Sequence, residues 1–147
     1  PILSAAVVGA AGLALTGWYF VDVVRNGPSI RWTDAMDPLQ HTLEDLRAPR
    51  IYVADWGLIE TMQLQSEGRL PIQMADLSSD EAMRALLAQE GAIFVAHASG
   101  LAIDPHQRAT LEVLAQREQF VEEPVTTVHD RNGRPAFDVF RFRKLHL

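Results

Sequence analysis

The sequence contains no cysteine among its 147 residues. This absence excludes a disulfide framework, thiolate metal sites and a cysteine nucleophile. Glycine-rich phosphate loops and the G-x-S-x-G elbow of serine hydrolases are also missing. The spacing of His41, His106, His129 and His146 does not match that of metal ligands. The sequence therefore predicts neither a metal site nor a bound cofactor.

Positive charge is scarce, because 13 Lys and Arg residues stand against 19 Asp and Glu residues, for a net charge of −6. Within the first thirty residues, only Asp22 and Arg25 are charged, so the acidic excess belongs to the rest of the chain. Affinity for nucleic acid comes mainly from basic side chains that meet phosphates. We therefore expect no nucleic-acid partner.

An uncharged apolar run occupies residues 2–21. A helix of about 20 apolar residues crosses the hydrocarbon core of a bilayer, which is about 30 Å thick. Trp18, Tyr19 and Phe20 lie at the end of the run, and aromatic rings favour the membrane interface. The run therefore predicts a membrane contact through residues 2–21.

The predicted organisation has three parts: a transmembrane helix over residues 1–24, a linker over 25–33, and a soluble domain over 34–147. A buried core helix is one alternative for the apolar run, although the run has no polar face. A signal-peptide remnant is another, although no basic leader is visible. Because the chain begins at Pro1 rather than Met, we expect it to be processed or to be part of a longer protein.

The soluble part alternates predicted strands and helices. Short apolar runs predict buried strands at residues 51–54, 70–74 and 92–96, and apolar periodicity predicts helices at 34–47, 58–66, 78–89 and 105–118. This alternation indicates a parallel sheet with right-handed crossovers. Two further strands, 124–129 and 136–142, flank an Asn-Gly hairpin signal. We expect an α/β three-layer sandwich with a parallel centre and an antiparallel C-terminal hairpin at one edge.

Two helix starts carry specific signals. Asp37 is expected to cap the first amphipathic helix, with Pro38 in its first turn. Ser78 is expected to cap a later helix in a capping box with Glu81. Spacings of three and four residues place the apolar residues of the first helix on one inward face: Met36, Leu39, Leu43 and Leu46.

Polar residues follow two of the predicted strands. Asp55 and Trp56 come directly after the first strand, and His97 follows the third. Ligands of open α/β sheets collect beyond the carboxyl ends of the strands. If the two strands are neighbours, Asp55 and His97 share one rim, where they can act as an acid–base pair or orient a ligand. The alternatives are a helix cap for Asp55, a hydrogen-bonded strand-end histidine for His97, and a lid over the core or a sugar-stacking platform for Trp56.

The C-terminal segment alternates basic and aromatic residues. Arg141 and Arg143 are two positions apart, so they share one face of a strand, and Lys144 follows them. These cations are candidates for contact with anionic lipid headgroups or a lipid-linked phosphate. The alternative is a charged edge strand that resists aggregation.

Three stretches of the chain resemble bacterial membrane glycosyltransferases of the dolichyl-phosphate-mannose–protein mannosyltransferase-like type. They are Trp32 with the following amphipathic helix and residues 50–57 (RIYVADWG), residues 92–97 (AIFVAH), and residues 129–137 (HDRNGRPAF). The resemblance is to the soluble domain that ends such proteins after a last membrane helix. It covers residues 30–144, and its motifs are short.

The resemblance implies a parent enzyme of the bacterial inner (plasma) membrane that transfers a sugar from a polyprenyl-phosphate donor. The soluble domain would lie on the extracytoplasmic side, after an upstream transmembrane domain of the same protein, with a lipid-linked sugar as a possible partner. The catalytic acidic residues of that family lie in loops between early membrane helices, so none is carried over onto this chain. The domain itself would help to bind the acceptor or to shape the active site.

Two other functions remain open from the residues. One is a membrane-tethered binding or assembly domain with no enzyme attached. The other is a small soluble α/β enzyme that uses Asp55 and His97. A ligand or a perturbed pKa at their shared rim would favour the enzyme.

Overall fold

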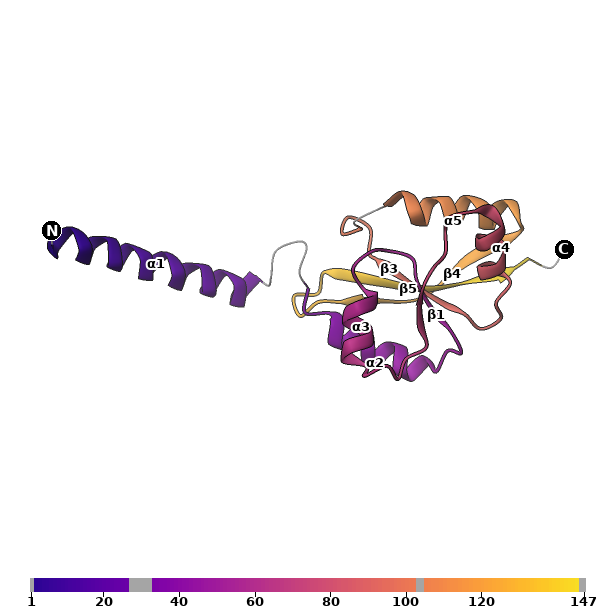
Figure 1. Cartoon of the computed structure of the whole chain (residues 1–147), viewed down its shortest axis with the longest axis horizontal. Helices are drawn as coiled ribbons and strands as arrows, with labels where there is room; N and C mark the ends of the chain where they lie inside the picture. Colours follow the sequence, from indigo (N-terminus) through magenta and orange to yellow (C-terminus); the bar gives the residue numbers. More distant parts are fainter. Residues whose placement is uncertain (1, 27–32, 103–104, 146–147) are drawn as a thin grey trace. The chain divides into compact units, whose positions relative to one another are not determined.

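The structure is a computed structural model that describes residues 2–26, 33–102 and 105–145 (Figure 1). It divides into two compact units, Pro1–Asp34 and Ala35–Leu147. The first unit contains helix α1, Ile2–Asn26. Within it, Ser4–Arg25 is long and apolar enough to cross a membrane, and none of its most apolar window is buried. Insertion in a membrane remains a prediction from length and composition.

The second unit contains a five-stranded mixed sheet in the order β2-β1-β3-β5-β4. Strands β2, β1 and β3 are mutually parallel, whereas β5 runs antiparallel to both β3 and β4. The predicted α/β domain with a parallel part and a C-terminal hairpin at one edge is therefore confirmed. The strand bounds are Ile51–Val53 (β1), Ile72–Met74 (β2), Ile93–His97 (β3), Phe120–His129 (β4) and Pro135–Lys144 (β5).

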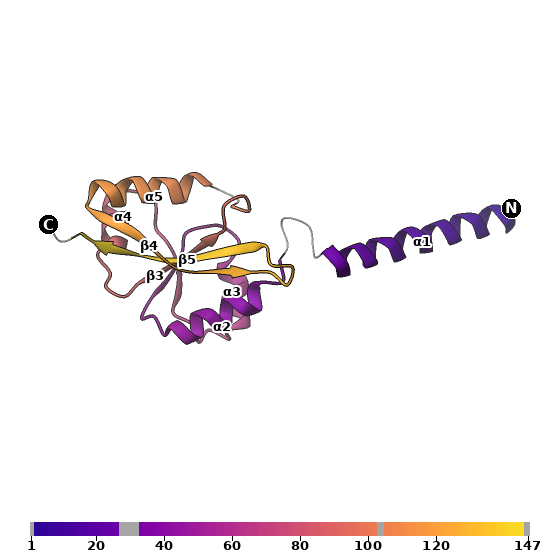
Figure 2. The same ribbon diagram turned by 180° about the vertical axis from the view of Figure 1, so that it is seen from behind.

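Helices cover both faces of this sheet (Figures 1 and 2). Helices α2 and α3 lie on one face, and α4 and α5 lie on the other. The helix bounds are Met36–Leu46 (α2), Ile59–Gln65 (α3), Asp80–Leu87 (α4) and Pro105–Arg117 (α5). Each lies within a few residues of its predicted range.

Alternate residues of the central strands supply two separate hydrophobic clusters. Val53 and Val95 belong to the cluster that includes α2, whereas Tyr52 and Phe94 belong to the cluster that includes α4 and α5. Every residue of β1 is buried. Successive side chains of a strand point to opposite faces, so a run that is apolar at every position marks a strand covered on both sides.

Two predicted helix caps are wrong. The N-cap residue of helix α2 is Ala35, which makes no side-chain cap hydrogen bond. Asp37 instead lies inside the first turn, where its charge favours the helix dipole. Helix α4 is capped by Ser79, whose hydroxyl accepts a hydrogen bond from the Ala82 amide. Ser78, the predicted cap, donates its hydroxyl to Asp76.

The inward face of α2 is narrower than predicted. Leu39 and Leu43 are buried, and Met36 packs against their cluster. Leu46 is 37% exposed. It lies in the last turn, directly before Arg47, where the chain leaves the helix with φ of 47°.

The C-terminal hairpin has the predicted turn but longer strands. The Asp130 amide donates to the Arg134 carbonyl, and the Gly133 amide donates to the Asp130 carbonyl. Gly133 has φ of +77°, a conformation that glycine adopts without steric cost. Pro124 lies inside β4 beside a register shift, and a proline is tolerated at a bulge of an edge strand.

Candidate functional site

The strand order reverses direction between β1 and β3. From β1 the chain crosses to β2 on one side, and from β2 it returns to β3 on the other side of β1. The two crossovers therefore diverge above the carboxyl ends of β1 and β3. Ligands of open α/β sheets bind in the crevice at such a point. Asp55 and His97 lie at these two strand ends.

The Asp55 and His97 side chains are hydrogen-bonded to each other across this crevice. His97 Nδ1 lies 2.7 Å from Asp55 Oδ2. The Asp55 side chain is 2% exposed and the His97 side chain 15% exposed. The backbone amide of Trp56 donates to Asp55 Oδ1 at 2.7 Å. The predicted shared rim is confirmed, because β1 and β3 are paired neighbours.

The N-cap residue of α3 is Leu58 rather than Asp55, and Leu58 makes no side-chain cap hydrogen bond. The tight turn after β1 instead directs the Asp55 carboxylate toward β3, and Gly57 makes this turn with φ of +86°. His97 is indeed a hydrogen-bonded strand-end histidine, and its ring packs against Phe137 with centroids 5.3 Å apart. This support fixes the orientation of the imidazole.

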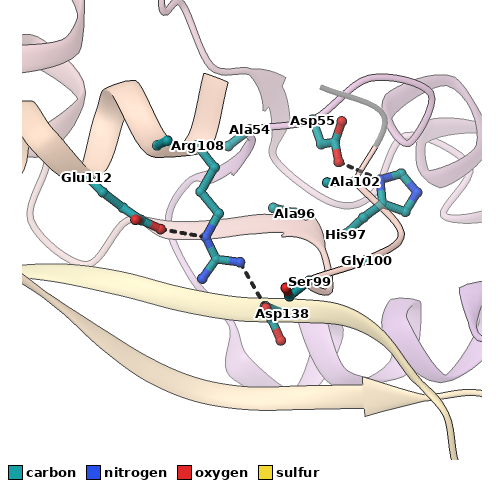
Figure 3. A pocket seen from close by; sticks show the side chains of 11 residues that line it. Ala54, Asp55, Ala96, His97, Ser99, Gly100, Ala102, Arg108, Glu112 and Asp138 are labelled. Atoms are coloured by element: carbon teal, nitrogen blue, oxygen red, sulfur yellow. Dashed lines mark hydrogen bonds and ion pairs between the residues drawn. The ribbon is translucent and has the colours of Figure 1, made fainter. Parts of the chain in front are cut away.

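A cavity of about 320 Å³ opens beside the pair (Figure 3). Its polar lining comes from four elements or their ends: Asp55, His97, Ser99, Arg108, Glu112 and Asp138. The rest of the lining is alanine and glycine, so the backbone lies close to the cavity. The volume falls within the range of about 300–1,000 Å³ that small-molecule pockets occupy.

Arg108 is the centre of an ion-pair cluster on the opposite wall. Its guanidinium donates to Glu112 at 2.9 Å, to Glu122 at 2.7 Å and to Asp138 at 2.8 Å. It also stacks over the Phe140 ring, 4.6 Å from the centroid. Figure 3 shows Arg108 reaching from α5 toward Asp138 on β5. The cluster therefore ties α5 to the C-terminal hairpin.

Burial shapes the protonation of this cluster. Burial alone would lower the pKa of Arg108, but the hydrogen bond to Asp138 and the charge of Glu122 raise it above its ordinary range. Desolvation raises the pKa of Glu122, against the opposing effect of Arg108. The guanidinium is thus always charged, with more negative than positive groups around it.

This cluster was not predicted from the sequence. Arg108 and Glu112 are four residues apart on a helix, which is a readable signal of an ion pair. Their link to Asp138 depends on the pairing of β5 with β3, which places Asp138 opposite Ala96. No local pattern encodes that register.

Trp56 lines a second hollow, of about 560 Å³, together with residues that follow β2. Its side chain is 66% exposed. The expected lid over the core is therefore wrong, since a lid would bury the indole. The same hollow includes Met74, which is 43% exposed, and the carboxylate of Asp76.

The basic residues of the C-terminal strand are already partnered. Arg141 and Arg143 both pair with Glu123 on β4, the first at 3.0 Å. Their predicted position on one face of a strand is confirmed. Lys144 lies over the Phe120 ring, 5.8 Å from its centroid. The alternative of a charged edge strand is wrong, because β5 lies between β3 and β4 in the sheet. Contact of these cations with lipid or phosphate remains a prediction.

The lining of the cavity offers groups that can form hydrogen bonds. Among the residues that the structure describes, no group of three or more His, Asp or Glu side chains is placed to hold a metal ion. Ser99 lines the cavity, but within the described ranges no hydrogen bond joins it to His97. An oriented imidazole beside a buried carboxylate can position a ligand hydroxyl or amine.

The chain was compared with protein-family models, with curated proteins and with solved structures. None of these comparisons found a match. The resemblance to membrane glycosyltransferases therefore remains a prediction based on the short motifs alone.

Proposed function

We propose that this chain is the extracytoplasmic C-terminal domain of a bacterial membrane glycosyltransferase, anchored by α1, and that its cavity beside Asp55 and His97 helps to bind the acceptor. The observation that carries this proposal is the buried Asp55–His97 pair at the reversal of strand order, open to a cavity of ligand size. The sequence motifs resembling that family supply the identity of the parent enzyme.

The proposed layout places one part of the chain in lipid and the other in water. The apolar surface of α1 supports a membrane anchor, since the helix carries no charged residue before Asp22. The two hydrophobic clusters on opposite faces of the sheet support the three-layer sandwich expected for the soluble domain. Placement outside the cytoplasm is inferred from the family resemblance.

Binding accounts for the site better than independent catalysis does. Covalent catalysis requires a nucleophile within hydrogen-bond reach of the base. Within the described ranges, His97 hydrogen-bonds to Asp55 and no serine or threonine hydroxyl is bonded to its ring. A small enzyme that uses Asp55 and His97 is therefore the weaker candidate. A tethered binding domain without an attached enzyme uses the same cavity and differs only in its parent protein.

Sugar transfer by membranes that contain the full parent protein tests the proposal. Labelled mannose or glucose is supplied on polyprenyl phosphate, and transfer to endogenous acceptors is followed for the wild type, Asp55→Asn and His97→Ala. We expect transfer at limiting acceptor to fall at least about tenfold in both variants, equivalent to about 1.4 kcal/mol of lost binding. Leu64→Ala, on the exposed side of α3, is the matched control and transfers normally.

Two results would count against this function. Wild-type transfer rates in both variants, at equal protein levels, would show that the cavity does not help to bind the acceptor. A wild-type parent that transfers sugar from neither donor would remove the glycosyltransferase assignment and favour the tethered binding domain.

A further inference from the structure

The hollow beside Trp56 is separate from the cavity of the Asp55–His97 pair, because the described linings of the two share no residue. It has a volume of about 560 Å³, within the range of small-molecule pockets. Besides Trp56 and Gln107, its described lining is the continuous stretch 74–78, which ends β2 and leads toward α4. This hollow is large enough to hold a ligand of its own.

The two walls of this hollow leave the sheet from paired positions. Val53, the last residue of β1, pairs with Met74, the last residue of β2. The Ala75 amide then donates to the Val53 carbonyl at 2.9 Å. On the other wall, the Trp56 amide donates to Asp55 Oδ1 at 2.7 Å. Hydrogen bonds therefore fix the backbone of both walls in place.

Two large apolar side chains are open to water at this hollow. Trp56 is 66% exposed and Met74 is 43% exposed. The face of an indole carries the negative part of the ring quadrupole, and tryptophan is the aromatic residue that attracts a cation best. The thioether of methionine is polarisable and adapts to the shape of its neighbour. The exposed indole thus supplies one half of a site for an organic cation.

Asp76 is the one charged residue in the described lining. Its Oδ1 accepts from the Ser78 hydroxyl at 2.6 Å and from the Ser78 amide at 3.0 Å. These two bonds hold the pKa of Asp76 below its ordinary value, so the carboxylate is ionised at neutral pH. Among the described residues, no Lys, Arg or His side chain pairs with this carboxylate, and no hydrogen bond reaches its Oδ2. The hollow therefore contains an uncompensated negative charge beside an exposed indole.

These features distinguish between classes of ligand. A phosphate or carboxylate would approach the Asp76 charge with no cation to compensate it. An acyl chain would remove water from the same charge. A metal ion requires several oxygen or nitrogen ligands, and no group of three or more His, Asp or Glu side chains in the described ranges is placed to hold one. A neutral ring gains contact with the indole alone, whereas an organic ammonium ion gains from both the indole and the carboxylate.

We propose that this hollow binds an organic ammonium group, which lies over the Trp56 indole and pairs with the Asp76 carboxylate. The ligand is a small amine or quaternary ammonium compound, and an amino sugar and a choline group both carry this chemistry. The site goes beyond the proposed function, because it does not use the Asp55–His97 cavity and does not require that the parent protein transfers sugar.

Binding is measured on the full chain in a neutral polyoxyethylene detergent, which carries no ammonium group. The signal is the ¹³C-methyl NMR resonance of Met74, assigned by its loss in Met74→Leu. Choline is compared with dimethylbutanol, its neutral isostere with carbon in place of nitrogen, and glucosamine is compared with glucose. At about pH 6 both amines are charged and Asp76 is ionised. We expect each ammonium ligand to bind at least about tenfold more tightly than its neutral counterpart. The tighter of the two identifies which source of the group the site prefers.

Substitutions separate the charge from the ring. Asp76→Asn keeps an acceptor for Ser78 but loses the charge, so choline binding should weaken at least about tenfold while dimethylbutanol binding is unchanged. Trp56→Leu keeps apolar bulk without a ring face and should also weaken choline binding, with Trp56→Tyr between this variant and the wild type. Asp45→Asn, which removes a carboxylate on α2, is the matched control and binds choline as the wild type does. The rest of each spectrum checks that the variant is folded.

Three results would overturn this inference: equal binding of choline and dimethylbutanol, unchanged choline binding in Asp76→Asn, or equal weakening in Asp45→Asn. Tighter binding of glucose than of glucosamine would replace the ammonium site with a neutral saccharide site. These readouts are independent of the transfer assay. Loss of transfer in Asp55→Asn without ammonium binding at Met74 would reject this site and retain the proposed function. Ammonium binding with unchanged transfer would do the reverse.

Discussion

His97 Nδ1 lies 2.7 Å from Asp55 Oδ2, although the two residues are 42 positions apart in the chain. An ionised carboxylate only accepts hydrogen bonds, so we assign the imidazole proton to Nδ1. In that tautomer, Nε2 carries no proton and can accept a hydrogen bond. The carboxylate therefore sets both the orientation and the tautomer of the histidine, as orienting groups do for catalytic and ligand-binding histidines.

Loss of the imidazole is expected to destabilise the domain. His97→Ala removes the Nδ1 donor from a nearly fully buried carboxylate and should lower the free energy of unfolding by about 1–3 kcal/mol. His97→Asn places an amide N–H near the same position and should recover a large part of this loss. Thermal unfolding of the full chain in detergent, at pH 7, compares the three proteins. Equal stability of the alanine and asparagine variants would contradict the role assigned to Nδ1.

The Arg108 cluster should contribute more than an exposed ion pair does. Arg108→Met leaves three carboxylates close together in a half-buried place and should cost about 2–4 kcal/mol. Arg117→Met on the same helix is the matched control, because its pair with Asp80 is 3.5 Å long and exposed. The control should cost less than about 1 kcal/mol. Denaturant unfolding of both variants measures the difference, and similar losses would show that the cluster adds no special stability.

Two adjacent serines at the start of α4 are expected to contribute differently to stability. Ser79→Ala removes the hydroxyl that accepts from the Ala82 amide and should cost about 1 kcal/mol of stability. Ser78→Ala removes only an exposed bond to Asp76 and should cost less. Denaturation midpoints measured under identical conditions rank the two variants. The reverse order would identify Ser78 as the cap.

Most of this fold could be predicted because the apolar pattern of each strand shows whether one or both faces of the sheet are buried. β1 is apolar at every position and β3 at every position before His97, and both strands contribute to the two hydrophobic clusters. The shared rim of Asp55 and His97 follows from parallel strands that end at one edge. This part of the site depends on topology alone, which alternation of strands and helices reveals.

Other features were not predictable because the sequence is compatible with more than one arrangement. Ser78 and Ser79 are both good caps, and only the backbone geometry selects Ser79, which is extended with ψ of 156°. Trp56 is large and apolar, so burial was expected, yet the turn after β1 leaves its indole exposed. Asp138 reaches Arg108 through the register of β5 on β3, which is a long-range property.

The hairpin turn gives the protein a defined acid sensitivity. Hydrogen bonds from the backbone amide of Arg134, together with its side chain and the Asn132 amide, hold the pKa of Asp130 below its ordinary value of 3.8. Below that ordinary value the unfolded chain binds the proton more readily than the folded one. The stabilisation is therefore complete above about pH 5 and is lost as the pH falls through the folded pKa.

Asp130→Asn is expected to remove this contribution to the pH dependence while keeping an oxygen acceptor for the turn amides. Unfolding temperatures of the full chain at pH 6 and pH 3 should therefore differ less in the variant than in the wild type. Asp45→Asn, on α2, provides a control for the loss of one carboxylate. An identical pH response in the wild type and Asp130→Asn would contradict the assignment.

Helix α1 should hold the chain in membranes by its apolar surface. Leu13→Lys places a charge near the middle of the apolar segment, at a cost of about 2.5–3.5 kcal/mol for insertion. Val24→Lys, near the end of the same segment, lets the ammonium reach the interface and should cost little. Resistance to alkaline carbonate extraction distinguishes the variants. Complete extraction of the wild type would contradict a membrane-spanning α1.

A decisive experiment is ¹⁵N NMR of the His97 ring in the full chain, assigned with His97→Asn, during addition of cellotetraose and mannotetraose. We expect the proton on Nδ1 to remain against Asp55, while the Nε2 signal shifts in a saturable manner with at least one saccharide. A deprotonated Nδ1, or an Nε2 signal that no saccharide moves, would contradict a ligand site built on the Asp55–His97 pair.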